Sequence, residues 1–129
     1  MTNLSEFLLI SEVETTKKVE LTGRTYGHPF TIKSMTNDEL KEYRKASQTF
    51  VNGRQQIDEN KLNMLMIKNH VLDPNFKDSE MIEKAKVNTP EELINKVLNF
   101  GEISALTLAI LELSGFNTTF EEHVQEAKN

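Results

Sequence analysis

A stretch near the end of the chain limits the possible folds most strongly, because it is apolar on almost every side. From Glu102 to Leu113 the polar residues are Glu102, Ser104, Thr107 and Glu112. A helix of this kind must be surrounded by other elements in a folded domain. Ser114-Gly115 supplies the usual helix stop. We therefore expect the helix from Glu102 to Leu113 to lie at the centre of the core and to be its most buried element.

The segment from Lys17 to Ser34 shows a different periodicity. Val19 and Leu21 alternate with polar residues, and Phe30 and Ile32 repeat this pattern after a segment rich in turn-forming residues. A period of two is typical of half-buried strands. The segment therefore predicts an antiparallel hairpin whose loop is longer than the tight two-residue type.

Helix-start signals predict the helical elements. Thr36 with Glu39, and Thr89-Pro90 with Glu92, have the spacing of capping boxes. Asn3, with Glu6 three residues on, and Asp78 are further predicted caps. The Thr36 helix is predicted to carry on one face Leu40, Tyr43, Ser47 and Phe50. After a loop at Asn52-Gly53, a further helix that ends at Asp73-Pro74 is predicted to bury Leu62, Leu65, Met66 and Leu72.

These elements predict an α+β fold, in which an N-terminal antiparallel β-hairpin packs against a mainly helical C-terminal bundle of four or more helices. A length of 129 residues fits one domain over residues 1–129. Residues 1–15 are expected to form a short, mobile N-terminal helix. A last short helix, capped by Thr118 or Thr119, is expected to place Phe120 and Val124 against the domain.

Composition and charge exclude several classes of protein. Residues 1–72 hold 9 acidic and 10 basic side chains, and residues 73–129 hold 11 acidic and 5 basic. Such scattered basic residues disfavour nucleic acid as a partner. The absence of cysteine is typical of a reducing compartment. The apolar run at Phe7–Ile10 is too short for a signal peptide, and no run has membrane-spanning length. We expect a cytoplasmic protein without a membrane partner.

No set of residues has the spacing of a catalytic or metal site. His28, His70 and His123 are far apart in sequence and are predicted to be surface histidines. The paired glutamates at 91–92 and 121–122 fall in first helical turns, where negative charge is favoured. The glycines form no phosphate-binding motif. We therefore expect neither an enzyme nor a bound cofactor or metal.

Four segments, taken in order, resemble the XkdN-like tail assembly chaperones of tailed phages and phage-derived elements. They are FTIKSMTNDEL from Phe30, DPNFKD from Asp73, TPEELINKVL from Thr89, and GEISALTLAILELSGF from Gly101, which runs into FEEHVQEAKN. The resemblance covers about Val19 to Asn129. It departs from the family at Ala85-Lys86-Val87, where many members have Tyr-Gly-Val, and in the hairpin loop, which lacks an Asp-Gly turn.

The resemblance implies a phage or prophage protein that binds the tape measure protein, keeps it soluble, helps recruit tail tube subunits, and is absent from the mature virion. An alternative is a small structural virion component, such as a connector or tail completion protein. An enzyme and a DNA-binding regulator are further alternatives. The oligomeric state stays open.

For the partner-binding surface, we single out apolar residues of the second half that cannot all fit inside the core: Phe100, Phe116, Phe120 and Val124. A chaperone for apolar helices requires an apolar groove or helix face surrounded by charge, and the acidic second half supplies that charge. The competing interpretation is that these four residues close the core.

Overall fold

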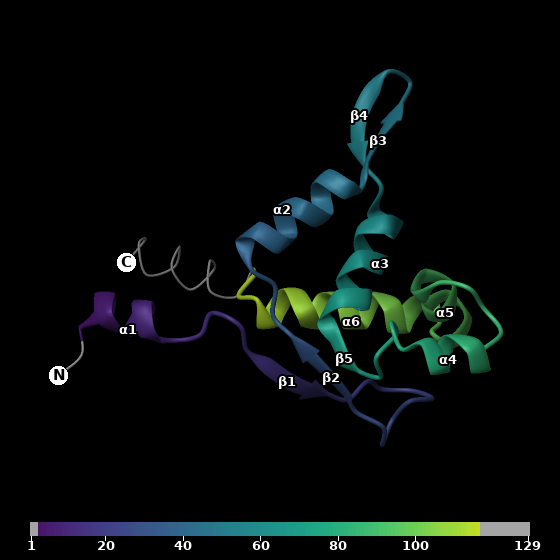
Figure 1. Cartoon of the computed structure of the whole chain (residues 1–129), viewed down its shortest axis with the longest axis horizontal. Helices are drawn as coiled ribbons and strands as arrows, with labels where there is room; N and C mark the ends of the chain where they lie inside the picture. The colour runs from purple at the N-terminus through teal and green to yellow at the C-terminus, as the bar shows by residue number, and fades with distance from the viewer. Residues whose placement is uncertain (1–2, 117–129) are drawn as a thin grey trace.

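The computed structural model describes residues 3–116 (Figure 1). Its elements, in chain order, are α1 (Leu4–Ile10), β1 (Thr16–Val19), β2 (Phe30–Lys33), α2 (Asn37–Ala46), β3 (Gln48–Val51), β4 (Arg54–Ile57), α3 (Glu59–His70), β5 (Val71–Asp73), α4 (Ser79–Lys84), α5 (Pro90–Val97) and α6 (Phe100–Leu113). An antiparallel sheet near the N-terminus and helices toward the C-terminus confirm the predicted α+β class.

The predicted hairpin is present as β1 and β2, which pair antiparallel with Thr16 opposite Lys33. A third strand, β5, pairs antiparallel with the other edge of β2. The prediction that Leu72 lies on a helix is therefore wrong. Helix α3 ends at His70, and the chain continues as a strand because β-branched Val71 and the residue before Pro74 both favour extended backbone.

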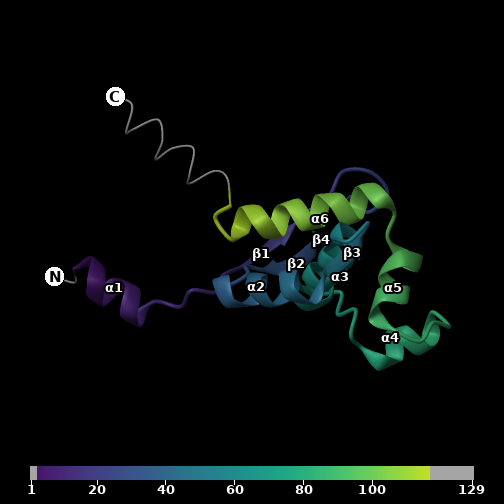
Figure 2. The same cartoon turned by 90° about the horizontal axis from the view of Figure 1, so that it is seen from above.

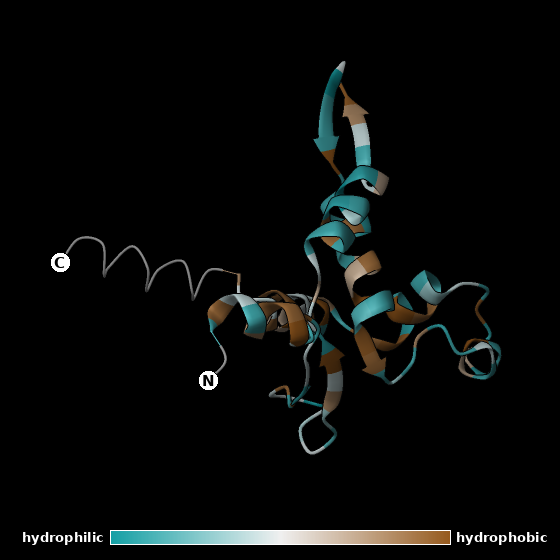
Figure 3. Ribbon diagram, turned by 60° about the vertical axis from the view of Figure 1, so that its left-hand side comes forward, coloured by the Kyte–Doolittle hydropathy of each residue, from teal (hydrophilic) through white to brown (hydrophobic). Residues whose placement is uncertain are grey.

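A second hairpin, β3–β4, was not predicted, and the assignment of Phe50 to the α2 face is wrong. Helix α2 ends at Ala46, and Phe50 lies in β3 opposite Gln55. Asn52 and Gly53 both have positive φ (54° and 77°) and form the two-residue turn. An Asn-Gly pair is the strongest local hairpin signal, because the turn requires positive φ at both positions. The two strands project from the body as an arm (Figures 1 and 3).

The helix starts follow the predicted caps closely. Asn3, Thr36, Asp78 and Thr89 are the N-caps of α1, α2, α4 and α5, and the Thr36–Glu39 capping box is complete. At α5 the Thr89 side chain accepts from Glu92 N–H, but the Glu92 carboxylate accepts from Asn88 N–H. That box is therefore only half formed.

Helix α6 lies along one face of the β1–β2 hairpin and crosses α3 (Figures 1 and 2). It begins at Phe100, two residues earlier than predicted. Leu106 and Ile110 are fully buried, whereas Leu108 is half exposed. Helix α3 contributes as many buried residues as α6 does, and three of them, Met66, Ile67 and His70, are fully or almost fully buried. The centre of the core is thus shared between α3 and α6.

Candidate functional site

The structure separates the predicted binding residues. Phe100 is the first residue of α6 and is 84% exposed, while Phe116 follows the end of the same helix and is 46% exposed. A helix of fourteen residues is about 20 Å long, so these two side chains lie at opposite ends of α6. They cannot belong to one small patch. Phe120 and Val124 lie outside the described residues.

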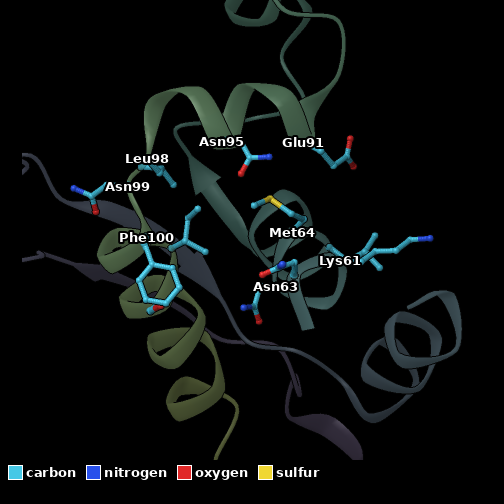
Figure 4. Close-up of a pocket in the computed structure, with 12 residues that line it drawn as sticks. Lys61, Asn63, Met64, Glu91, Asn95, Leu98, Asn99 and Phe100 are labelled. Carbon is cyan, nitrogen blue, oxygen red and sulfur yellow. The ribbon is translucent and has the colours of Figure 1, made fainter. Parts of the chain in front are cut away.

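Phe100 borders an open groove formed by α3, α5 and the start of α6 (Figure 4). The groove has a volume of about 690 Å³. Helices α5 and α6 meet at a bend of 117°, and α3 packs against both of them. This elbow between α5 and α6, together with α3, defines what we call the elbow groove. Its lining consists of Asn60, Lys61, Asn63, Met64, Leu65, Glu91, Asn95, Leu98, Asn99, Phe100, Ile103 and Ser104.

The elbow groove combines an apolar surface with amide and charged groups. Its apolar side chains are Met64, Leu65, Leu98, Phe100 and Ile103. Methionine is flexible and polarisable, so it adapts to partners of varied shape. The amides of the lining asparagines can donate and accept hydrogen bonds. Such a surface suits an amphipathic polypeptide segment better than a small charged ligand.

One ion pair borders the groove. The Lys68 ammonium donates to the Glu91 carboxylate at 2.9 Å, linking α3 to α5. The hydrogen bond from Lys68 holds the pKa of Glu91 below its usual value. Glu91 therefore has a structural role, in agreement with its predicted place in a first helical turn. Lys61 supplies a further positive charge to the lining.

The elbow itself is fixed by a buried carboxylate. Glu102 Oε1 accepts from Asn99 N–H at 2.9 Å and from Arg24 Nη2 at 2.7 Å, while Glu102 N–H donates to the Asn99 side chain. Arg24 also donates to the Val97 carbonyl at the end of α5. Burial alone would raise the pKa of Glu102, but the Asn99 and Arg24 hydrogen bonds hold it below its usual value.

The sequence contained part of this signal. Asn99 followed by Glu102 has capping-box spacing, which is the local signal for a helix that begins at Phe100 and not at Glu102. The contact with Arg24 spans 78 positions of sequence, so no local pattern predicts it. The bend that creates the elbow groove is likewise a tertiary feature.

Helix α1 is a second apolar surface. None of its residues is buried, and Leu9 is 85% exposed. The helix extends away from the body (Figures 1 and 2). Its exposed apolar side chains are Leu4, Phe7, Leu8, Leu9 and Ile10, followed by Val13. The sequence predicts a short helix within residues 1–15, but not that its apolar side chains are exposed as one surface.

The prediction that all three histidines lie on the surface is wrong for His70, which is fully buried. Its Nε2 is 2.8 Å from the Tyr43 hydroxyl and 3.8 Å from a Glu39 oxygen, so it joins α3 to α2. His70 follows the buried residues Met66 and Ile67 by four and three positions, so it shares their face of the helix. This spacing is the local signal for its burial. His28 is exposed, and His123 lies outside the described residues.

Two features of residues 3–116 bear on other functions. Within this part of the chain, no three histidine, aspartate or glutamate side chains gather as a metal site would require. No single helix in it is long and apolar enough to cross a membrane, although α5 and α6 reach that length and composition as a bent pair.

Comparison with known proteins gives a matching family model, a relative in sequence and a solved structure of similar fold. The family model described as phage XkdN-like tail assembly chaperone protein matches residues 4–128. The uncharacterized protein YqbN of Bacillus subtilis (strain 168) is 29% identical over 107 residues, which are 78% of this chain and 72% of YqbN. A crystal structure of YqbN is similar with a TM-score of 0.68 at 22% identity, covering 91% of this chain and 99% of that chain. The chain therefore belongs to the XkdN-like family of phage tail assembly chaperones.

Proposed function

We propose that this protein binds the tape measure protein during tail assembly and keeps its apolar helical segments soluble while tail tube subunits assemble. The observation that carries the proposal is the elbow groove, an open apolar surface on a member of a tail assembly chaperone family. An amphipathic helix of the partner would place its apolar face against Met64, Leu65 and Ile103, beside exposed Phe100. The asparagine amides would bond to polar groups at the edge of that helix.

The exposed helix α1 supplies a second apolar contact in this proposal. Two weak contacts on one molecule bind a long partner more strongly than either does alone, provided that both can be reached at once. The protein would act in the host cytoplasm, carry out no catalysis, and be absent from the finished particle.

Co-expression with the tape measure protein tests this role. Phe100→Ala removes the most exposed apolar side chain of the elbow groove, and Tyr26→Ala removes a similarly exposed aromatic, 71% against 84%, outside it. We expect the soluble fraction of the tape measure protein to fall with Phe100→Ala and to stay unchanged with Tyr26→Ala. Equal solubility with both variants would exclude the groove as the site.

Immunoblotting of purified particles separates the proposed chaperone role from the alternative, a structural component of the virion. A chaperone that leaves the tail is absent from them, whereas a connector or tail completion protein is present in a fixed ratio to the other tail proteins. Detection at such a ratio would replace the proposed function with the structural alternative.

A further inference from the structure

The arm formed by β3 and β4 has two edges of different character. Among residues 3–116 neither strand pairs with a third. Strand β4 carries Arg54, but β3, with the sequence Gln-Thr-Phe-Val, has no charged residue and no proline. Exposed strand edges are normally protected from unwanted pairing by such residues. The β3 edge lacks this protection, and Phe50, a residue of this strand, is 74% exposed.

The hydrogen-bond pattern identifies the free backbone groups of β3. Asp58 N–H donates to the Ser47 carbonyl at 2.7 Å, so these two residues form a hydrogen-bonded pair at the base of the arm. Bonded and non-bonded pairs alternate along an antiparallel ladder. Thr49 and Val51 therefore bond to β4, while Gln48 and Phe50 direct their N–H and C=O groups away from it.

We propose that β3 pairs with β3 of a second copy of this chain, antiparallel and across a two-fold axis at Thr49. This register places Gln48 of each copy opposite Phe50 of the other, so the free backbone groups of both residues meet. The two β3 strands form the centre of a four-stranded sheet, in which the Arg54 side chains lie on the two outer strands. A two-stranded sheet is marginal in water, and two more strands stabilise it.

A second copy fits this edge better than a charged partner does. A two-fold interface uses the same patch on both subunits, and the uncharged β3 strand meets itself without placing like charges together. Threonine opposite threonine is also a favourable cross-strand pair. A partner strand bearing carboxylates would find no cation on β3. The contact is small compared with the roughly 800 Å² per partner of a stable interface, so the dimer is expected to depend on protein concentration.

A disulfide test is direct, because the chain contains no cysteine. Facing residues of a non-bonded antiparallel pair have Cα atoms about 4.5 Å apart, within the range of a disulfide. Oxidation of the full-length Thr49→Cys protein should therefore give a covalent dimer. Gln56→Cys is the matched control, since Gln56 is opposite Thr49 on β4. A dimer from Gln56→Cys that forms as fast as the Thr49→Cys dimer would overturn the inference.

Sedimentation velocity over a range of concentrations provides the second readout. Thr49→Lys should weaken the dimer by roughly five- to tenfold, because like charges directly opposite each other destabilise a sheet. Gln56→Lys adds the same charge on the outer strand and should leave the dimer unchanged. Phe50→Lys, at an exposed position that would face Gln48 of the other copy, places a charge on the pairing edge and gives a second test should Thr49→Lys fail to fold. A chain that is monomeric at every concentration, or a dimer lost with Leu8→Glu but kept with Thr49→Lys, contradicts the pairing.

Discussion

The elbow groove and helix α1 are both apolar and open, but they differ in what holds them in place. The elbow is fixed by the Asn99–Glu102 capping box, by Arg24 and by the packing of α3 against α5 and α6. Helix α1 has one cap, Asn3, and no buried residue. A preformed groove binds without a large ordering cost, whereas an unsupported helix must be ordered by its partner. We infer that specificity resides in the groove and that α1 adds affinity.

The largest expected effect comes from the core, on the buried side of α6. Ile110→Asp places an unpaired charge at a fully buried position of α6 and should destabilise the protein by several kcal/mol. Leu108→Asp, on the same helix but half exposed, should cost much less. Urea unfolding of both variants measures the difference. A similar loss in the two variants would mean that α6 is oriented differently.

The next effect concerns the elbow. Glu102→Ala removes the acceptor for Asn99 N–H and Arg24, and should lower the free energy of unfolding by about 1–3 kcal/mol. Glu112→Ala alters an exposed glutamate of the same helix and serves as the control. The Glu102 variant should also bind the tape measure protein less tightly. Unchanged binding in a destabilised variant would show that the bend need not be preformed.

The helix caps, Phe50 and Phe100 show how much of the structure the sequence alone can predict. The starts of α1, α2, α4 and α5 agree with the sequence prediction, because each cap and its partner lie two or three residues apart. The prediction for Phe50 is wrong because its spacing from Tyr43 and Ser47 fits a helix, whereas the signal for the hairpin lies in the Asn52-Gly53 turn that follows it. The elbow groove could not be predicted, since it depends on a bend and on contacts between distant segments. The sequence points to Phe100 as a binding residue, but it gives no sign of the residues that face Phe100 across the groove.

The stability of the protein is expected to depend on pH through His70, which belongs neither to the elbow groove nor to helix α1. Burial lowers the pKa of His70 below 6.5, although Glu39 opposes the shift and Lys33 adds to it. The unfolded chain then binds the proton more readily, so His70 contributes stability above about pH 6.5 that is lost as the pH falls toward its folded pKa. Urea unfolding at about pH 7.5 and 5.5 should show lower stability at the lower pH.

Replacement of His70 should weaken that dependence in the same pH range. His28→Gln, at an exposed histidine, controls for the loss of one imidazole. A pH dependence that is identical in the His70→Gln variant and the parent would show that other groups cause it.

The smallest expected effect on stability is at α1. Leu9→Asp changes a side chain that is 85% exposed, on a helix without buried residues, so the free energy of unfolding should stay within about 0.5 kcal/mol of the parent. Binding to the tape measure protein should nevertheless weaken, which isothermal titration of the two proteins measures. A large loss of stability would show that α1 packs on the body.

Methionine methyl signals test the central claim most directly, namely that the elbow groove is the binding surface. The chain has five methionines: Met64 lines the groove, while Met35 and Met66 are buried in the core. With ¹³C-methyl-methionine labelling, addition of the tape measure protein should shift the Met64 signal and leave those of Met35 and Met66 in place. A complex in which the Met64 signal is unchanged would contradict the proposed site.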